Sequence, residues 1–323
     1  MLYALCGPLR ALFRAALPLT LCPPDAECGT ADEKTVEQLA DAYKDKHVLC
    51  VGGTRGIGKA TADVIRRAGG RVTVVGRSAE EAHDGISADL STVGGCQDLE
   101  RQLVKLGRTY DYVLFTIGVW PSHADAQTSD GLHKVFAIDL LSRHCVLGAL
   151  VRNNLVGDAV RVMSVLASSQ SVPIDRPSLR SLLEDATRPD GVTGLARGFQ
   201  LMIGTAVAAD AWLRAVEHTL PPDACLMGTF PGLLVTDLAS STVPGWLMGP
   251  FKLLQAPLSD SDEDCGLKHA TILASTNAAR RRVSYWAAPR LEAHEPHPLA
   301  MDSEMGAWLY ETLEKLRNTK TLE

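Results

Sequence analysis

The fold is decided by residues 51–58, which read Val51-Gly52-Gly53-Thr54-Arg55-Gly56-Ile57-Gly58. The apolar run from 47 to 51 suits a buried parallel strand, and 56–68 has the periodicity of a helix. In such a unit Gly52 permits a tight turn, Gly56 lets the backbone approach a pyrophosphate, and Gly58 lets the helix pack close to the sheet. Phosphates would then bind the free N–H groups of the helix N-terminus. The stretch predicts a dinucleotide-binding loop, with a glycine-rich turn that binds no ligand as the alternative.

Strands and helices alternate along the rest of the chain. The pattern predicts further strands over 71–75, 86–89, 110–117, 159–165 and 225–229, and helices over 32–45, 97–106, 130–152 and 199–219. Such alternation indicates an α/β fold, a Rossmann-type doubly wound parallel sheet with helices on both faces. Since no internal repeat occurs, we expect one nucleotide-binding domain over 32–323, preceded by an N-terminal extension over 1–31.

Composition narrows the classes of partner. The net charge of −6 argues against a nucleic-acid-binding face, so a small-molecule substrate or a protein partner is expected. The eight cysteines are dispersed without metal-ligand spacing, which predicts reduced, buried thiols and no metal site.

The first 21 residues are apolar but interrupted by Arg10 and Arg14, so an integral membrane segment is not expected. A packed or disordered extension, a mitochondrial targeting segment and a membrane-surface helix remain open for them. A cytoplasmic location is the first expectation, with a mitochondrial one as the alternative.

The cofactor preference depends on the end of the second predicted strand. NAD-selective sites usually place an acid there to accept from the ribose 2′-hydroxyl. This chain reads Val75-Gly76-Arg77-Ser78 instead. Because Arg77 can bind a 2′-phosphate and Arg55 could add a second cation, NADP(H) is favoured over NAD(H).

With these motifs the sequence resembles the short-chain dehydrogenase/reductase family, and within it the retinol-dehydrogenase-like branch. The resemblance also includes Asp89-Leu90 after the third strand, the sequence Thr128-Ser129-Asp130-Gly131 before the central helix, Pro231-Gly232 with Thr236-Asp237, and Trp308-Leu309-Tyr310-Glu311 near the end. It implies an oxidoreductase that transfers hydride between a nicotinamide and a carbonyl or alcohol. The implied cofactor-binding residues are Gly52, Thr54, Arg55, Gly56, Ile57, Gly58, Arg77, Asp89, Leu90, Gly118, Pro231, Gly232 and Thr236.

The chain departs from the family at every position that transfers protons. The family's tyrosine, and the lysine four residues later, align with Met202 and Ala206. Its serine falls near Leu166 or Ala167, just before Ser168 and Ser169, and its helix asparagine is Asp139. No tyrosine occurs between Tyr112 and Tyr285, and no lysine between Lys134 and Lys252, so no shift of the alignment restores the pair. The catalytic residues are therefore unassigned.

Several residues could substitute for the missing groups. Arg197 could replace the lysine as a cation near the ribose, or be a surface residue. Four carboxylates in the segment expected to cover the site could act as acid or base, or be solvated caps: Asp175, Glu184, Asp185 and Asp190.

Two functions follow from this sequence. One is an oxidoreductase with an atypical proton donor; the other is a catalytically inactive, nucleotide-binding regulatory or interaction protein. The resemblance also implies a homodimer or homotetramer formed through the helices at 130–152 and 199–219.

Overall fold

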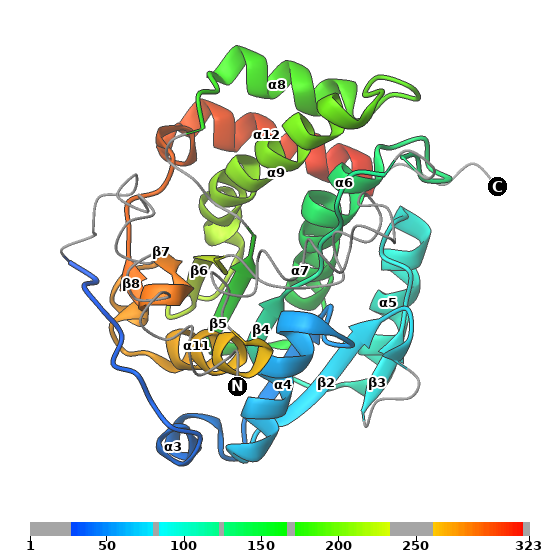
Figure 1. Cartoon of the computed structure of the whole chain (residues 1–323). Helices are drawn as coiled ribbons and strands as arrows, with labels where there is room; N and C mark the ends of the chain where they lie inside the picture. Colours follow the sequence, from blue (N-terminus) through cyan, green and yellow to red (C-terminus); the bar gives the residue numbers. More distant parts are fainter. Residues whose placement is uncertain (1–26, 80–83, 123–125, 167–171, 233–260, 319–323) are drawn as a thin grey trace, which may run out of the picture.

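One sheet of eight strands organises the part of the chain that the structure describes, in the order β3-β2-β1-β4-β5-β6-β7-β8 (Figure 1). The computed structural model describes residues 27–79, 84–122, 126–166, 172–232 and 261–318. The strands are β1 His47–Val51, β2 Arg71–Gly76, β3 Gly85–Ser87, β4 Tyr110–Phe115, β5 Val156–Val165, β6 Cys225–Phe230, β7 Val283–Ala287 and β8 Glu292–Ala293. All neighbours pair in parallel except β7 with β8. The predicted doubly wound α/β sheet is confirmed.

Helices cover both faces of this sheet and enclose two hydrophobic cores. The helices are α3 Ala40–Tyr43, α4 Gly56–Arg67, α5 Val93–Leu106, α6 Lys134–Phe136, α7 Ser142–Arg152, α8 Arg176–Asp185, α9 Leu195–Val216, α11 Asp262–Ala274 and α12 Ser303–Arg317. A π-helical segment at Ala137–Leu141 joins α6 to α7, and short 3-10 turns lie at Glu37–Leu39, Glu217–Thr219, Ala278–Arg280, Ala288–Arg290 and Pro298–Met301. Helices α3, α4 and α11 contribute to one core, and α5, α7, α9 and α12 to the other.

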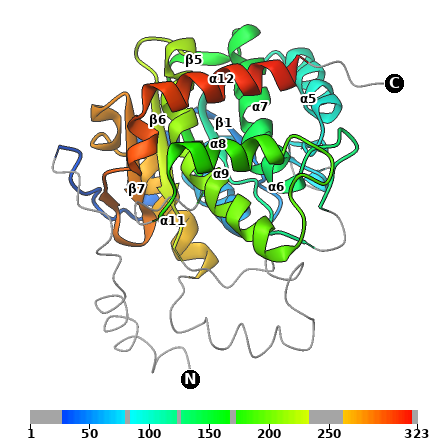
Figure 2. The same cartoon turned by 90° about the horizontal axis from the view of Figure 1, so that it is seen from above.

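Helix α12 packs across α9 and α7 (Figure 2). These are the helices through which the family resemblance implies dimer contacts. A dimer that used them would therefore have to include α12 or use another of their faces. The homodimer or homotetramer stays a prediction.

Three predicted helices begin at other residues than expected, among them α9, which starts at Leu195 instead of 199. Helix α5 starts at Val93, four residues early, because the Thr92 hydroxyl accepts from the Gly95 N–H at 3.0 Å and caps it. The long helix starts at Lys134 instead of 130. The Asp130 carboxylate instead accepts from the Val93 N–H at 2.7 Å, at the beginning of α5.

The ends of the chain were predicted less well. The expected helix over 32–45 is reduced to one 3-10 turn and α3. Residues from the expected extension lie against the domain, since Cys28 is buried and Ala31 N–H donates to Leu291 O at 2.8 Å. Strands β7 and β8 and helix α11 were not predicted, whereas α12 includes the motif at 308–311. Within the described ranges, none of the helices is long and apolar enough to cross a bilayer.

The turn between β1 and α4 brings three segments into close contact. Gly52 has φ +96°, and a Cβ there would lie 2.5 Å from the Ile117 nitrogen. A Cβ on Gly58 would lie 2.2 Å from Thr116 Oγ1 and 2.4 Å from Gly52 O. The first turn of α4 therefore packs directly on the ends of β1 and β4, as the glycine spacing predicted.

Replacing Gly58 by alanine tests this contact. A Cβ at these distances must displace backbone, so Gly58→Ala should lower the free energy of unfolding by about 1–3 kcal/mol, measured by urea denaturation. Gly306→Ala, in α12, is the matched control. A Cβ at Gly306 would meet only the Cβ of Ala215, at 3.8 Å. That change should stabilise the chain by about 0.5–1 kcal/mol. Equal stability of Gly58→Ala and the native chain would contradict the close packing.

Candidate functional site

The predicted cofactor residues come together at the carboxyl edge of the sheet. The loop at 52–58 follows β1, Arg77 follows β2, Asp89 and Leu90 follow β3, Gly118 follows β4, and Pro231 and Gly232 follow β6. The chain proceeds from β1 to one side of the sheet and from β4 to the other, so the edge between them is the switch point of the topology. Ligands of open α/β sheets bind in the crevice at such a point. Thr236 lies outside the described residues.

The loop leaves room for a ligand at the beginning of α4. Gly56 has φ +54°, and a Cβ there would meet no atom within 4 Å. Arg55, the residue before the helix, gives α4 no side-chain cap. Helices α5, α8, α11 and α12 are capped by Thr92, Asp175, Ser261 and Asp302. Among the described residues, no side chain accepts from the first-turn N–H groups of α4, which can therefore receive an anion.

Two exposed arginines flank this loop. Arg55 and Arg77 form no ion pair with any residue in the described part of the chain. The residues before them, Thr54 and Gly76, lie close together, since a Cβ on Gly76 would be 2.9 Å from Thr54 Cγ2. Both guanidinium groups are thus available to a negatively charged group near the end of β2.

The other predicted residues differ in what they can offer. Asp89 is exposed, and its Oδ1 accepts from the Ser91 N–H at 3.0 Å. The Leu90 side chain is buried in the core, so only its backbone could contact a ligand. Gly232 has φ +81° and lies against Pro289, which would clash with a Cβ at 2.4 Å.

A buried arginine connects the segments that lie at the carboxyl edge of the sheet. Arg143 on α7 is fully buried, and all five guanidinium N–H groups donate hydrogen bonds. Nε donates to Ser164 Oγ at 3.1 Å, Nη1 to the carbonyls of Ile138 at 3.3 Å and Asp139 at 2.6 Å, and Nη2 to those of Ile117 at 2.7 Å and Val165 at 3.1 Å. Arg143 thereby joins the π-helical segment to the carboxyl ends of β4 and β5.

Asp139 lies in the middle of the π-helical segment, beside the end of β4. Its Oδ1 accepts from the Val119 N–H at 3.1 Å and would lie 3.6 Å from a Cβ on Gly118. Burial raises the pKa of this carboxyl to about 7, although the nearby Arg143 charge and the Val119 hydrogen bond act to lower it. Burial also lowers the pKa of Arg143 to about 10, against the effect of Asp139. Sequence reasoning placed Asp139 at the family's asparagine but missed Arg143 altogether.

The five tyrosines in the described ranges have partners or positions of their own. The hydroxyls of Tyr43, Tyr112 and Tyr285 donate to the carbonyls of Ala270, Ala42 and Asp210. Tyr110 begins β4, and Tyr310 on α12 packs between His144 and His218. Burial raises the pKa of all five.

The substitutes suggested by the sequence have other partners. Arg197, at the beginning of α9, pairs with Asp185 at 3.1 Å and also contacts Gln200. Asp175 caps α8 by accepting from the Ser178 N–H at 2.9 Å, and Asp185 also pairs with Arg188. Arg197 therefore already has a carboxylate partner, and its role as a replacement for the lysine stays a prediction.

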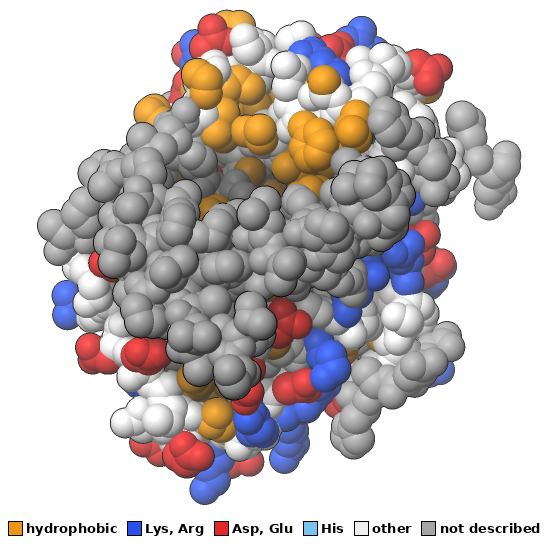
Figure 3. All heavy atoms as spheres, viewed as in Figure 1, with side chains coloured by type: hydrophobic (Ala, Val, Ile, Leu, Met, Phe, Trp, Pro, Cys, Tyr) orange, Lys and Arg blue, Asp and Glu red, His pale blue; other side chains and the backbone are white. Residues whose placement is uncertain are grey.

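Apolar side chains border the edge on the side of α9. Trp120 packs edge-to-face on Phe199 with ring centroids 5.9 Å apart, and Met202 follows one turn later on α9. Hydrophobic side chains also gather around α9 on the molecular surface, where Ile203 is 42% exposed (Figure 3). A partly apolar substrate would suit this side.

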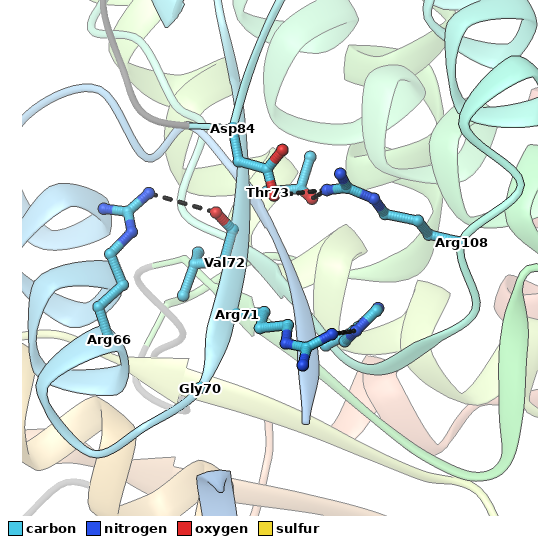
Figure 4. Close-up of a pocket in the computed structure, with 8 residues that line it drawn as sticks. Arg66, Gly70, Arg71, Val72, Thr73, Asp84 and Arg108 are labelled. Carbon is cyan, nitrogen blue, oxygen red and sulfur yellow. Dashed lines mark hydrogen bonds and ion pairs between the residues drawn. The ribbon is translucent and has the colours of Figure 1, made fainter. Parts of the chain in front are cut away.

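A separate cavity of about 490 Å³ lies at the opposite, amino edge of the sheet. His47 and Arg71 begin β1 and β2 there, and Arg66 and Arg108 extend towards β2 (Figure 4). Arg66 also pairs with Asp63, and Arg108 with Asp84. Its size alone does not make it the site, since it lies far from the glycine loop in the topology and its charges are largely paired.

Comparison with known proteins begins with the sequence. No protein-family model matches the chain. An uncharacterized oxidoreductase of Saccharomyces cerevisiae is 33% identical over 105 residues, which are 31% of this chain. The match spans only about a third of the yeast protein, 34% of its length.

Solved structures cover much more of the chain. A short-chain dehydrogenase/reductase from Serratia marcescens gives a TM-score of 0.54 at 18% identity, covering 76% of this chain and 98% of that one. The 3-alpha-hydroxysteroid dehydrogenase from a Pseudomonas species, complexed with NADH, gives 0.55 at 20% identity, with 75% and 95% covered. BdcA in complex with NADPH gives 0.52 at 15% identity, with 76% and 93% covered. The chain has the fold of the short-chain dehydrogenase/reductases.

Because Arg143 connects these segments, its removal should lower the stability of the fold. Arg143→Met should lower the free energy of unfolding by about 3–5 kcal/mol, because it leaves four carbonyls and Asp139 without their buried cation. Chemical denaturation measures the loss. Arg152→Met is the control on the same helix, since Arg152 pairs with Glu100 at the surface at 2.9 Å and should contribute about 0–1 kcal/mol. Similar losses in the two variants would contradict the assignment.

Proposed function

We propose that this chain, which has the fold of the short-chain dehydrogenase/reductases, is an oxidoreductase that uses NADP(H). It would transfer hydride to a carbonyl or from an alcohol, with an atypical group exchanging the proton. The observation that carries the proposal is the loop at 52–58, where an uncapped helix N-terminus meets the open space at Gly56. This arrangement fits a pyrophosphate, because backbone N–H groups and the helix dipole both favour bound anions.

The preference for NADP(H) rests on charge at the end of β2. Arg77 is the first residue after this strand, where NAD-selective sites usually carry an acid. Together with Arg55 it offers two cations to a 2′-phosphate. The structural neighbours include one complex with NADH and one with NADPH, which supports a nicotinamide cofactor in general.

When bound, the reduced nicotinamide supplies a hydride to a carbonyl carbon. The residues implied to hold the cofactor are those of the loop at 52–58, Arg77, Asp89, Leu90, Gly118, Pro231, Gly232 and Thr236. The loop and Arg77 would fix the phosphates, and the ends of β4 and β6 would border the reacting ring. The apolar pair Trp120 and Phe199 would exclude water on the side of α9.

A second function is favoured by one specific observation. By the family resemblance, Met202 and Ala206 fall at the positions of the tyrosine and lysine, and neither can transfer a proton. A nucleotide-binding regulatory or interaction protein without turnover would keep the loop and lose that pair. The two proposals share the nucleotide site and differ only in hydride transfer.

Removing Arg77 tests the cofactor preference. Arg77→Ala should weaken NADPH binding about tenfold to a hundredfold, the equivalent of roughly 1.5–3 kcal/mol for hydrogen bonds to a charged group. NADH binding should not change, and nucleotide fluorescence titration measures both. Arg71→Ala is the matched control, an exposed arginine at the opposite end of the same strand. Equal loss for both nucleotides would contradict the assigned contact.

A measurement of NADPH turnover distinguishes the oxidoreductase from the nucleotide-binding protein without turnover. NADPH oxidation should be measured with benzaldehyde, decanal and cyclohexanone, using the native chain and Gly56→Trp. The indole would fill the open space at Gly56 and strain a residue of positive φ, so any true activity should disappear. Activity that survives in Gly56→Trp would come from a contaminant, and NADPH binding without turnover would favour the second function.

A further inference from the structure

The π-helical segment at Ala137–Leu141 departs from regular α-helical geometry. It interrupts an otherwise continuous helix from 134 to 152, and such bulges occur frequently at functional sites. It lets the Asp139 carbonyl accept from Arg143, while the Asp139 side chain reaches the Val119 N–H beside β4. A buried carboxyl group is thus held at the carboxyl edge of the sheet, next to Gly118.

We propose that Asp139 exchanges the proton with the substrate oxygen, in place of the missing tyrosine. This inference rests on the proposed function. In carbonyl reduction, the carbonyl carbon gains a hydride from the reduced nicotinamide, and the oxygen gains the carboxyl proton of Asp139. The products are an alcohol, the oxidised nicotinamide and the Asp139 carboxylate, which solvent protonates again. Alcohol oxidation runs the same transfers in reverse.

The surroundings of Asp139 suit a group that changes its protonation state near neutral pH. Burial raises its pKa to about 7, where a general acid and a general base are both available. Arg143 is the charged group that opposes this shift, and the Val119 N–H on the β4 side also favours the carboxylate. Helices α9 and α12 pack against the π-helical segment, and neither adds a charge that acts on Asp139 among the described residues.

The role proposed for Asp139 determines how the rates of reduction and oxidation change with pH. Reduction needs the protonated carboxyl, so its rate should be maximal below pH 7 and fall about tenfold per pH unit above it. Oxidation needs the carboxylate and should rise up to the same pH. Opposite pH profiles for reduction and oxidation, with the same midpoint, are expected when one group acts as both acid and base.

The protonation of Asp139 can be measured without a substrate. Carbon NMR of the full chain labelled at aspartate carboxyl carbons should show one resonance that titrates near pH 7 and disappears in Asp139→Asn. Adding NADP⁺ should lower this midpoint, because the positive nicotinamide ring favours the carboxylate. Asp139→Asn keeps the acceptor for the Val119 N–H and should fold.

The kinetic arm uses the carbonyl that the native chain reduces fastest. In Asp139→Asn, kcat for reduction should fall about 10²–10⁴-fold and lose its inflection, while NADPH binding stays unchanged. Asp210→Asn is the control, another buried carboxylate that packs beside Gly228 in the middle of β6 and should keep the profile.

The outcomes separate this inference from the proposed function. If NADP⁺ raises the melting temperature but leaves the Asp139 midpoint in place, Asp139 does not face the cofactor and the inference is overturned. Unchanged kcat and inflection in Asp139→Asn overturn it as well, as does NADPH binding without turnover by the native chain. If neither NADP⁺ nor NADPH changes the melting temperature, the proposed function itself fails.

Discussion

The arrangement of the site depends on a positive charge that the protein has buried. Removing a guanidinium from water costs several kcal/mol, and this cost is offset only when its donors are satisfied. Arg143 meets that condition with four backbone carbonyls and the Ser164 hydroxyl. These acceptors belong to the ends of two strands and to one helix, so the five bonds fix their relative positions. The π-helical segment and Asp139 are held in place by the same bonds.

A second constraint acts on the other side of the switch point. Gly58 and Gly52 allow α4, β1 and β4 to approach until no side chain fits between them. The uncapped helix N-terminus then faces the open space at Gly56. The fold therefore places an open helix N-terminus beside strand ends whose positions Arg143 fixes. Function resides in the side chains of a site, and a shared fold alone does not supply them.

Local sequence patterns were enough to predict most of the sheet and the loop. The segments from β1 to β2 and the strand β6 were predicted nearly residue by residue, because their apolar runs and glycine stops are adjacent in sequence. Helix α11 and strand β7 were missed, since both are buried on nearly all sides and show little alternation. Arg143 could not be recognised, because the three partners that tie it to the strand ends lie 21 to 26 residues away along the chain. The ion pair of Arg197 could not be foreseen for the same reason, as its carboxylate partner is 12 residues distant.

The most direct test of this account is a crystal structure of the full chain grown with NADPH. We expect the pyrophosphate on the N–H groups at the beginning of α4 and the 2′-phosphate between Arg55 and Arg77. The nicotinamide should lie beside Gly118, within reach of Asp139. A nucleotide bound instead in the arginine-lined cavity at the amino edge, or a glycine loop left empty at saturating NADPH, would contradict the account.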